Sequence, residues 1–325
     1  MRIGRDAKQV DDKGNTLMTL PYLKQLCKEQ KLYQTPELND KIYLHFKGFN
    51  KIDHLDAYTG LKSLWLEGNG IAKIENLDTL VELRCLYLQQ NCVETMENLE
   101  NLIKLDTLNL SNNLIRTISG LSHLPALRTL QLSHNFLRNA DDLRHLSECQ
   151  FISILDLANN KIDDPNIVDI FETMENLAVL TLMANPVTSK IQNYRRTLVA
   201  RCKGLTYLDD RPVFEKERLA TEAWARGGLE AEREERQRQR DEDRDQNMRN
   251  FEALRRLQEE ARERRRLAGQ EEHEPRFSPQ LTRLRDTMLA KPDEPNNEDH
   301  MMLAPAAESW DQAALALRAN TGATW

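Results

Sequence analysis

Three histidines, His123, His134 and His145, recur at regular spacing and are the first residues to consider for metal chemistry. A zinc site needs histidine, cysteine or carboxylate ligands that converge on one ion. Regular spacing along the chain instead indicates equivalent surface positions of a repeating structure. We therefore interpret these histidines as part of a repeat and predict no metal site.

Motifs for catalysis are also missing from the chain. The sequence contains no HExxH, no GxxxxGK[ST] and no GxSxG, the patterns of common metalloproteases, nucleotide-binding proteins and serine hydrolases. The pair Asp209-Asp210 follows an apolar segment, where packing and turn formation explain it more simply than acid–base catalysis. The sequence thus predicts a protein that is not an enzyme, with no catalytic residue and no cofactor.

Charge and composition restrict the kind of partner. The 325 residues contain 45 Lys and Arg against 52 Asp and Glu, for a net charge of −7, so neither nucleic acid nor an anionic membrane is the expected partner. The N-terminus has no apolar signal region, and no run of residues reaches the length of a transmembrane helix. Five cysteines without a CxxC pair are typical of free thiols in the reducing cytosol.

A leucine-rich motif explains the spacing of the remaining residues. The pattern LxxLxLxxN occurs six times, for example as LDTLNLSNN and LRTLQLSHN. The final asparagines, separated by steps of 22, 22, 22, 25 and 25 residues, are Asn69, Asn91, Asn113, Asn135, Asn160 and Asn185. KIYLHFK, one step earlier, is a degenerate first repeat. The repeats predict an α/β leucine-rich-repeat solenoid with short parallel strands on its concave face.

The leucines and asparagines have different roles in this prediction. One repeat cannot bury its own leucines, but stacked repeats share a continuous core. The asparagine amide both donates and accepts hydrogen bonds, so it can bind backbone groups where the chain leaves each strand. We therefore expect the six asparagines to form a structural ladder rather than a ligand site.

Segments at the two ends of the repeats indicate caps. We assign residues 1–36 to an N-terminal segment, with an amphipathic helix over 19–33, residues 37–192 to the repeats, and residues 193–229 to a C-terminal cap. The 25-residue repeats gain room for a short helix at 163–174. Residues 230–268 carry opposite charges at helical offsets and predict a solvated, coiled-coil-like helix. Residues 269–325 read as a disordered tail.

The outward strand positions are the candidate binding residues. Because the leucines of LxLxxN point inward, the residues between them line the concave face. One column across the strands contains Tyr43, Trp65, Tyr87, Asn109, Gln131 and Asp156. Exposed aromatic side chains are enriched at binding hot spots, whereas stacking alone would give them a purely structural role. We favour a protein-binding surface, because solenoids use extended concave faces for partners.

Two longer segments resemble a known family. KLYQTPELNDKIYLHFKGFNKI (31–52) and NYRRTLVARCKGLTYLDDRPVFEKERLATEAWARGGLEAEREER (193–236) are similar to the leucine-rich-repeat axonemal dynein assembly factors of ciliated cells. The similarity runs from about Leu17 to Arg236. Family members often continue with long acidic or low-complexity regions, whereas this chain ends at Trp325.

The resemblance implies a function that composition does not. Members of the family are non-enzymatic and are required for cytoplasmic preassembly of the dynein arms that drive ciliary beating. The implied protein is a monomeric scaffold in the cytoplasm, associated with the cilium or flagellum, whose partners are axonemal dynein chains, chaperones and co-assembly factors. The alternative is a regulatory or targeting subunit of a phosphatase or another enzyme that uses the same concave face.

Overall fold

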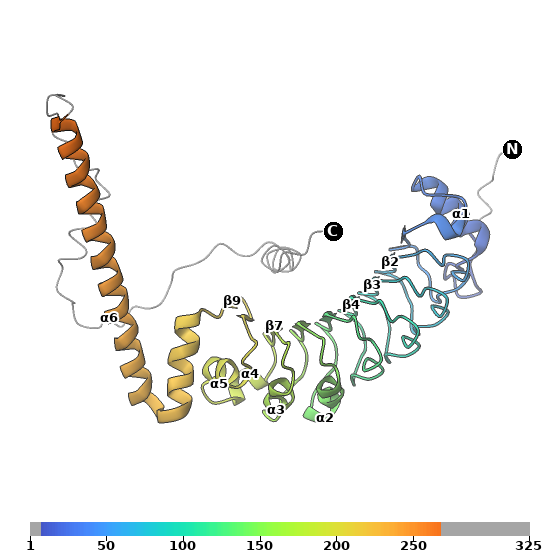
Figure 1. Ribbon diagram of the computed structural model, residues 1–325. Helices are drawn as coiled ribbons and strands as arrows, with labels where there is room; N and C mark the ends of the chain where they lie inside the picture. Colours follow the sequence, from blue (N-terminus) through green and yellow to red (C-terminus); the bar gives the residue numbers. More distant parts are fainter. Residues whose placement is uncertain (1–7, 268–325) are drawn as a thin grey trace. The chain divides into compact units, whose positions relative to one another are not determined.

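Residues 8–267 are described by a computed structural model, which divides into one unit up to Gln237 and a second from Arg238 onward. Two of our expectations, for the first seven residues and for the tail 269–325, lie outside the described residues. The first unit is an open stack of repeats, with its strands on the inner side of the curve (Figure 1). The predicted leucine-rich-repeat solenoid is confirmed.

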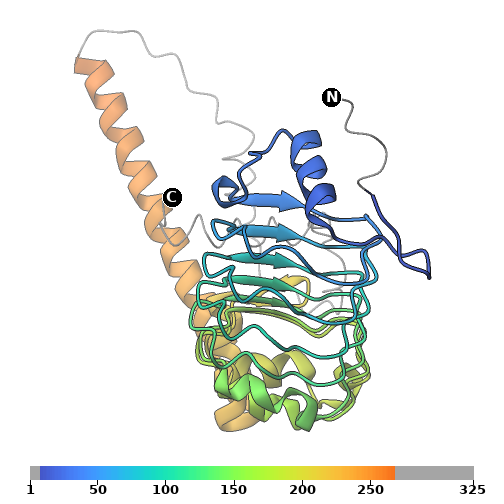
Figure 2. The ribbon, with the colours of Figure 1, turned by 90° about the vertical axis from the view of Figure 1, so that its right-hand side faces the viewer.

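One sheet runs through all the repeats. Its first seven strands are three residues long and pair in parallel, each with the next along the chain. They are β1 (Lys41–Tyr43), β2 (Ser63–Trp65), β3 (Cys85–Tyr87), β4 (Thr107–Asn109), β5 (Thr129–Gln131), β6 (Ile154–Asp156) and β7 (Val179–Thr181). The degenerate first repeat predicted at KIYLHFK therefore supplies strand β1. Figure 2 shows the strands stacked one above the next.

The leucines form one continuous core beneath this sheet. The central residue of each strand is fully buried, as Leu64, Leu86 and Leu108 illustrate, while its two neighbours are more exposed in the first five strands. Each repeat adds further buried aliphatic side chains from its return segment. Burial of one such side chain contributes about 1.5–3 kcal/mol, which explains why the leucine spacing within the motif is the same in every full repeat while the length of the return segment varies.

A left-handed residue turns the chain at the end of each strand. The residue just before each ladder position has a φ between 51° and 62° in all seven repeats, and the seven are Phe46, Gly68, Gln90, Asn112, His134, Asn159 and Ala184. Glycine and asparagine adopt this conformation readily, whereas other residues need support from their surroundings. The support comes from the hydrogen bonds of the ladder asparagines, which hold the turn that follows each strand.

Short helices lie on the outer face of the later repeats. They are α2 (Ala140–Leu143), the 3₁₀ helix η2 (Arg144–Glu148), α3 (Ile167–Glu172), α4 (Val187–Lys190) and α5 (Tyr194–Arg201). Helix α3 lies inside the segment 163–174 and buries Ile167, Val168 and Phe171. Helix α2 was not predicted from the sequence. There is room for it because its repeat, like the next one, has 25 residues. At the start of α2 the Asp142 carboxylate accepts the N–H of Asn139 at 3.0 Å, as in a capping box, and the Asp142 N–H donates to the Asn139 carbonyl at 3.1 Å.

Helix α1 (Leu20–Glu29) covers the N-terminal edge of the sheet, where Figure 2 shows it above the first strand. It buries Tyr22, Leu23, Leu26 and Cys27. The side chain of Gln30, just after the helix, accepts a hydrogen bond from Tyr43 N–H at 3.1 Å and donates one to Tyr43 C=O at 2.5 Å. The Gln30 amide thus takes the place of a neighbouring strand on the open side of β1. A short 3₁₀ helix, η1 (Pro36–Leu38), lies between α1 and β1.

The C-terminal edge ends in a comparable way. Strand β8 (Tyr207–Leu208) pairs with β7 in parallel, and β9 (Arg211–Pro212) turns back antiparallel to it. Asp209 has a φ of 53°, and its Oδ1 accepts the N–H of Leu182 at 2.8 Å. In earlier repeats the equivalent N–H donates to a backbone carbonyl of the next strand, as Leu157 N–H does to Thr181 C=O. The Asp209 carboxylate therefore supplies the acceptor that a further repeat would provide.

A long charged helix, α6 (Glu215–Leu267), follows the sheet and is interrupted by non-helical Gly227 and Gly228. Its first part belongs to the cap, and the composition change at residue 230 falls just after the interruption. Glu232 is 4% exposed and lies 3.2 Å from the guanidinium of Arg196 on α5. Farther along, Met248, Phe251, Leu254 and Leu257 are exposed.

Candidate protein-binding surface

The aromatic column of the concave face is held by the strand register. Tyr43 pairs with Trp65, and Trp65 with Tyr87, each as the last residue of its strand. The ring centroids of Tyr43 and Trp65 are 4.5 Å apart, and those of Trp65 and Tyr87 are 5.2 Å apart and nearly parallel at 15°. The rings therefore cover each other's faces, and their edges are directed to the solvent.

Two more rings lie beside this column. His45 lies edge-on to Tyr43 at 6.1 Å and to Phe46 at 5.8 Å, and Phe46 is 63% exposed. Sequence analysis did not include them among the candidate residues, although His45 stands two residues after Tyr43 and so shares its face. We call the five residues the aromatic cluster: Tyr43, His45, Phe46, Trp65 and Tyr87.

Gly68 makes room for the most exposed ring of the cluster. It lies at the left-handed turn after β2 with a φ of 62°, and a Cβ there would collide with the Phe46 ring. The repeat position that holds a side chain elsewhere is therefore left open beneath Phe46. Gln90 and His134 adopt the same backbone conformation in other repeats, so it is the space taken by the Phe46 ring that favours glycine here.

The polar half of the column ends in a buried carboxyl group. Asn109 and Gln131 are half-buried, and Asn109 Oδ1 accepts the N–H of Ser111 at 3.0 Å. Asp156 is only 4% exposed. Burial raises the pKa of its carboxyl, and bonds from Ala158 N–H and Ser133 oppose that shift. Asp156 thus contributes little accessible surface, whereas Asn109 and Gln131 are as accessible as the rings of Tyr43, Trp65 and Tyr87.

The ladder asparagines lie away from this surface and bond the backbone. Asn113 is typical: its Oδ1 accepts Val93 N–H at 2.9 Å, and its Nδ2 donates to the carbonyls of Leu88 at 2.9 Å and Leu110 at 3.0 Å. Equivalent bonds are made by Asn91, Asn135, Asn160 and Asn185. Asn69 at the first turn accepts three backbone N–H groups, from residues 47, 48 and 49.

The histidines and cysteines of the described residues are separate from one another or have structural contacts. His145 Nε2 accepts the N–H groups of Leu121 at 2.9 Å and Ser122 at 3.2 Å, so it closes the turn of the preceding repeat. Within residues 8–267, no three histidine, cysteine or carboxylate side chains are grouped as metal ligands. All five cysteines are free thiols, and burial raises the pKa of Cys149 and of Cys202 to about 12, which suppresses the nucleophilic thiolate.

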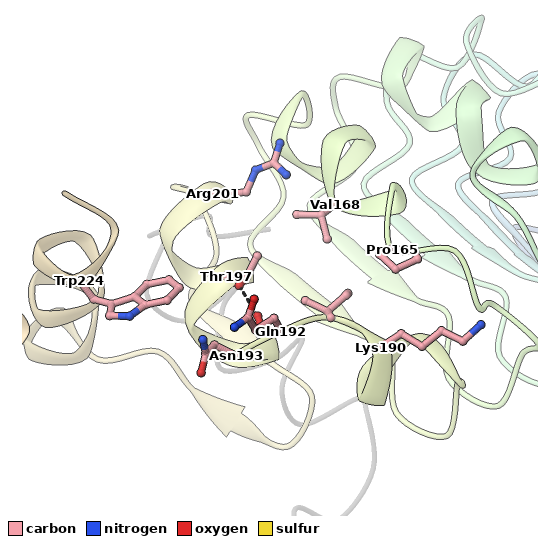
Figure 3. A pocket seen from close by; sticks show the side chains of 9 residues that line it. Pro165, Val168, Lys190, Gln192, Asn193, Thr197, Arg201 and Trp224 are labelled. Carbon is pink, nitrogen blue, oxygen red and sulfur yellow. Dashed lines mark hydrogen bonds between the residues drawn. The ribbon is translucent and has the colours of Figure 1, made fainter. Parts of the chain in front are cut away.

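A small groove lies at the C-terminal cap on the outer face (Figure 3). It has a volume of about 320 Å³, with Val168 and Ile191 among its apolar residues and Trp224 at one side. Its two cations are already paired: Lys190 lies 3.1 Å from Asp163, and Arg201 lies 2.8 Å from Asp169. The groove therefore presents no unpaired charge that would select a ligand.

Among residues 8–267, every helix falls short of the length or apolar character that crossing a membrane requires.

Comparisons with known proteins agree with the repeat pattern. A leucine-rich-repeat family profile matches residues 102–235. The chain is 63% identical to the dynein axonemal assembly factor 1 of Rattus norvegicus over 254 residues, which cover 78% of this chain and 40% of that protein. It is 59% identical to the dynein axonemal assembly factor 1 homolog of Drosophila yakuba over 222 residues, 68% of this chain and 15% of that protein. The chain thus spans less than half the length of these relatives.

Among solved structures, an internalin C2 of Listeria monocytogenes covers 58% of this chain and 92% of its own, with a TM-score of 0.45 and 20% identity.

Proposed function

This chain belongs to the leucine-rich-repeat family of axonemal dynein assembly factors, and from that premise we propose that it is a non-enzymatic scaffold for the cytoplasmic preassembly of axonemal dynein arms. Its partners are axonemal dynein chains together with chaperones and co-assembly factors. The protein acts as a monomer in the cytoplasm and also associates with the cilium or flagellum. Loss of the scaffold removes dynein arms and with them ciliary motility.

The observation that carries this proposal is the aromatic cluster on the concave face. Large aromatic rings that remain partly exposed, although the leucines already fill the core, are enriched at protein-binding hot spots. Phe46 at 63% exposure and the edge-exposed stack of Tyr43, Trp65 and Tyr87 supply such a surface. Asn109 and Gln131 extend this surface with polar side chains, and the buried Asp156 at its end adds little accessible area.

Copurification tests the identity of the partners. The tagged full chain is expressed at its normal level in ciliated cells, captured from the cytoplasmic fraction, and its bound proteins are identified by mass spectrometry. Dynein heavy or intermediate chains with chaperones are the expected result. Recovery of a phosphatase catalytic subunit without dynein chains would instead support a regulatory subunit and contradict the proposal.

Gene deletion tests the consequence in the cell. Electron microscopy of axoneme cross-sections should show missing outer and inner arms, while the microtubule doublets remain complete. Re-expression of the full chain should restore the arms. Axonemes with normal arms after deletion would exclude a required role in their assembly.

A further inference from the structure

The spacing of the aromatic rings selects the kind of segment that can lie on them. Neighbouring strands are about 4.8 Å apart, and the ring centroids follow at 4.5 and 5.2 Å. Side chains on one face of an α-helix recur three or four residues apart, which is about 4.5–6 Å along its axis. Those of an extended strand recur every 6.6 Å or so, and a polyproline helix repeats after about 9.3 Å. Of the three, the α-helix alone remains in register across all the rings.

The length of the stack also matches two helical turns. From Tyr43 to Tyr87 the column crosses two strand spacings, or about 10 Å. Apolar residues at positions i, i+3 or i+4, and i+7 of a helix span about 10.5 Å. Three anchors of one helix face can therefore each meet one ring of the stack.

The exposed ring edges specify the anchors. Because the rings of Trp65 and Tyr87 stack at 15°, their negative faces are turned toward each other and their positive edges toward the solvent. An edge favours the face of another aromatic ring or an aliphatic side chain over a cation. Phe46, exposed beside His45, adds apolar surface at one end of the stack.

The two borders of the stack carry opposite charges. Lys41 shares the concave face with Tyr43, because buried Ile42 lies between them. Lys41 and Lys62 are both exposed, and within residues 8–267 neither forms a salt bridge. Asp40 adjoins them, and the Glu82 carboxylate, which pairs with Lys104, also interacts with Lys62. These five residues together have a net charge of +1. On the opposite border, two residues after Trp65, the Glu67 carboxylate accepts a hydrogen bond from the Gln89 amide and gives a charge of −1.

We propose that the aromatic cluster docks an amphipathic α-helix of a protein partner, with apolar or aromatic residues at i, i+3 or i+4, and i+7 on the rings, and with its acidic border facing Lys41 and Lys62. This inference rests on the proposed function, because it names the kind of segment that the concave face recognises. The helix lies along the column, across the strands, and a basic residue on its other border meets Glu67.

Photo-crosslinking in the full chain identifies the docked segment. The crosslinking residue p-benzoylphenylalanine is placed at Ser63, in the row before the rings, and in a matched control at Glu100, an exposed residue of a return segment. Both proteins are expressed in ciliated cells, and crosslinked peptides are sequenced by mass spectrometry. The Ser63 position should capture a segment with apolar residues three or four apart and Asp or Glu along one border.

Charge reversal tests the orientation of that helix. Lys41→Glu combined with Lys62→Glu should lower the yield of the Ser63 crosslink by about threefold to tenfold, as expected when exposed ion pairs become repulsive. The matched change Lys73→Glu, in a return segment, should leave the yield unchanged, and circular dichroism melts of all variants should coincide. Capture of an extended or proline-containing segment, a yield insensitive to lysine reversal, or no capture above the Glu100 control would each overturn the inference.

Dynein chains are measured in the same samples, so that the two proposals can fail separately. If dynein chains are present but lysine reversal has no effect on the crosslink, the helix inference fails and the assembly function stands. If the predicted helix is captured from a partner in a sample without dynein chains, the helix inference stands and the assembly function fails.

Discussion

Substitution of Asn113 by alanine tests whether the asparagine ladder stabilises the repeats through hydrogen bonds. Asn113 is 3% exposed, and its three shortest bonds join buried backbone groups, the N–H of Val93 and the carbonyls of Leu88 and Leu110. The two carbonyls each keep another donor in the variant, since Leu88 C=O also accepts from Asn91 and Leu110 C=O from Asn135. The N–H of Val93 keeps none, because Asn113 Oδ1 is its acceptor.

The expected loss of stability follows from this difference between the N–H of Val93 and the two carbonyls. An unsatisfied buried N–H costs about 1–3 kcal/mol, and each of the two lost carbonyl bonds contributes less because its oxygen remains bonded. We therefore expect Asn113→Ala to lower the free energy of unfolding by about 1–3 kcal/mol, toward the upper end of that range. This is a large part of the roughly 5–15 kcal/mol that stabilises a typical domain.

The assay is urea unfolding of the full chain followed by far-UV circular dichroism, with hydrogen exchange at the Val93 amide as a local readout. The matched control is Asn101→Ala, at an exposed asparagine whose one bond, to Asp78, is 3.3 Å long. The control should remain within about 0.5 kcal/mol of the wild type. Equal stability of both variants would refute the ladder as a source of stability.

A second substitution separates hydrogen bonding from volume. Asn113→Asp retains the side-chain size and the acceptor for Val93, but it directs a carboxylate oxygen at two carbonyl oxygens. Repulsion and burial should make it less stable than Asn113→Ala at neutral pH. If the aspartate variant were as stable as the wild type, the donor half of the amide would have no role.

The remaining predictions concern the ends of the sheet and the caps. Ending the chain at Gln192 should cause the last repeats to unfold or aggregate, because Leu180 and Leu182 lose their cover. Ending it at Arg240 should leave the repeats folded, since Glu232 still binds Arg196. Thermal melts followed by circular dichroism compare the two shortened proteins. Equal stability of both would show that residues 193–229 are not the cap. Gln30→Ala should speed hydrogen exchange at the Tyr43 amide and lower the free energy of unfolding by about 1 kcal/mol. Unchanged exchange would contradict the role of the Gln30 hydrogen bonds in holding the edge of β1. Burial raises the pKa of Asp209 above the ordinary 3.8, so its contribution to stability is complete below that pH and is lost as the pH rises through the raised folded value. Asp209→Asn, which keeps an acceptor for Leu182 N–H, should therefore gain stability relative to the wild type as the pH rises toward neutral. Urea melts across this range measure the difference, and a pH-independent difference would contradict it.

The repeat period predicts most of the fold because it depends on packing alone. Stacked leucines at a fixed step determine the parallel strands, the shared core and the outward column. The relative order of Tyr43, Trp65 and Tyr87 on one face follows directly, since register is fixed once each leucine is buried.

The side chains that end the sheet could not be predicted in this way. Gln30 and Asp209 replace missing strands, but each does so through one hydrogen-bonding group whose position depends on the whole cap. Glu232 is similar: its helical partner Arg236 is visible in the sequence, whereas Arg196 comes from a separate helix. No periodic pattern marks such contacts.

The left-handed turns were likewise hidden by residue type. Gly68, Asn112 and Asn159 are typical of this conformation, but Phe46 and Ala184 are not. Tertiary hydrogen bonds impose the turn on whatever residue stands there. The same turn places Phe46 on the exposed end of the aromatic cluster, which explains why sequence analysis found three of the cluster's five rings.

The most direct test of the account is partner binding by Trp65→Ala, measured together with the stability of the purified protein. Removal of the central ring should weaken partner binding by more than about 2 kcal/mol, while the repeats lose less because Trp65 stacks on its neighbours rather than filling the core. Trp224→Ala, at a tryptophan outside the concave face, is the matched control and should retain the partner. In ciliated cells, Trp65→Ala should leave protein abundance near normal and reduce the dynein arms. Unchanged affinity of Trp65→Ala, with a lowered melting temperature and abundance, would show that the stacked rings only stabilise the sheet and would contradict the account.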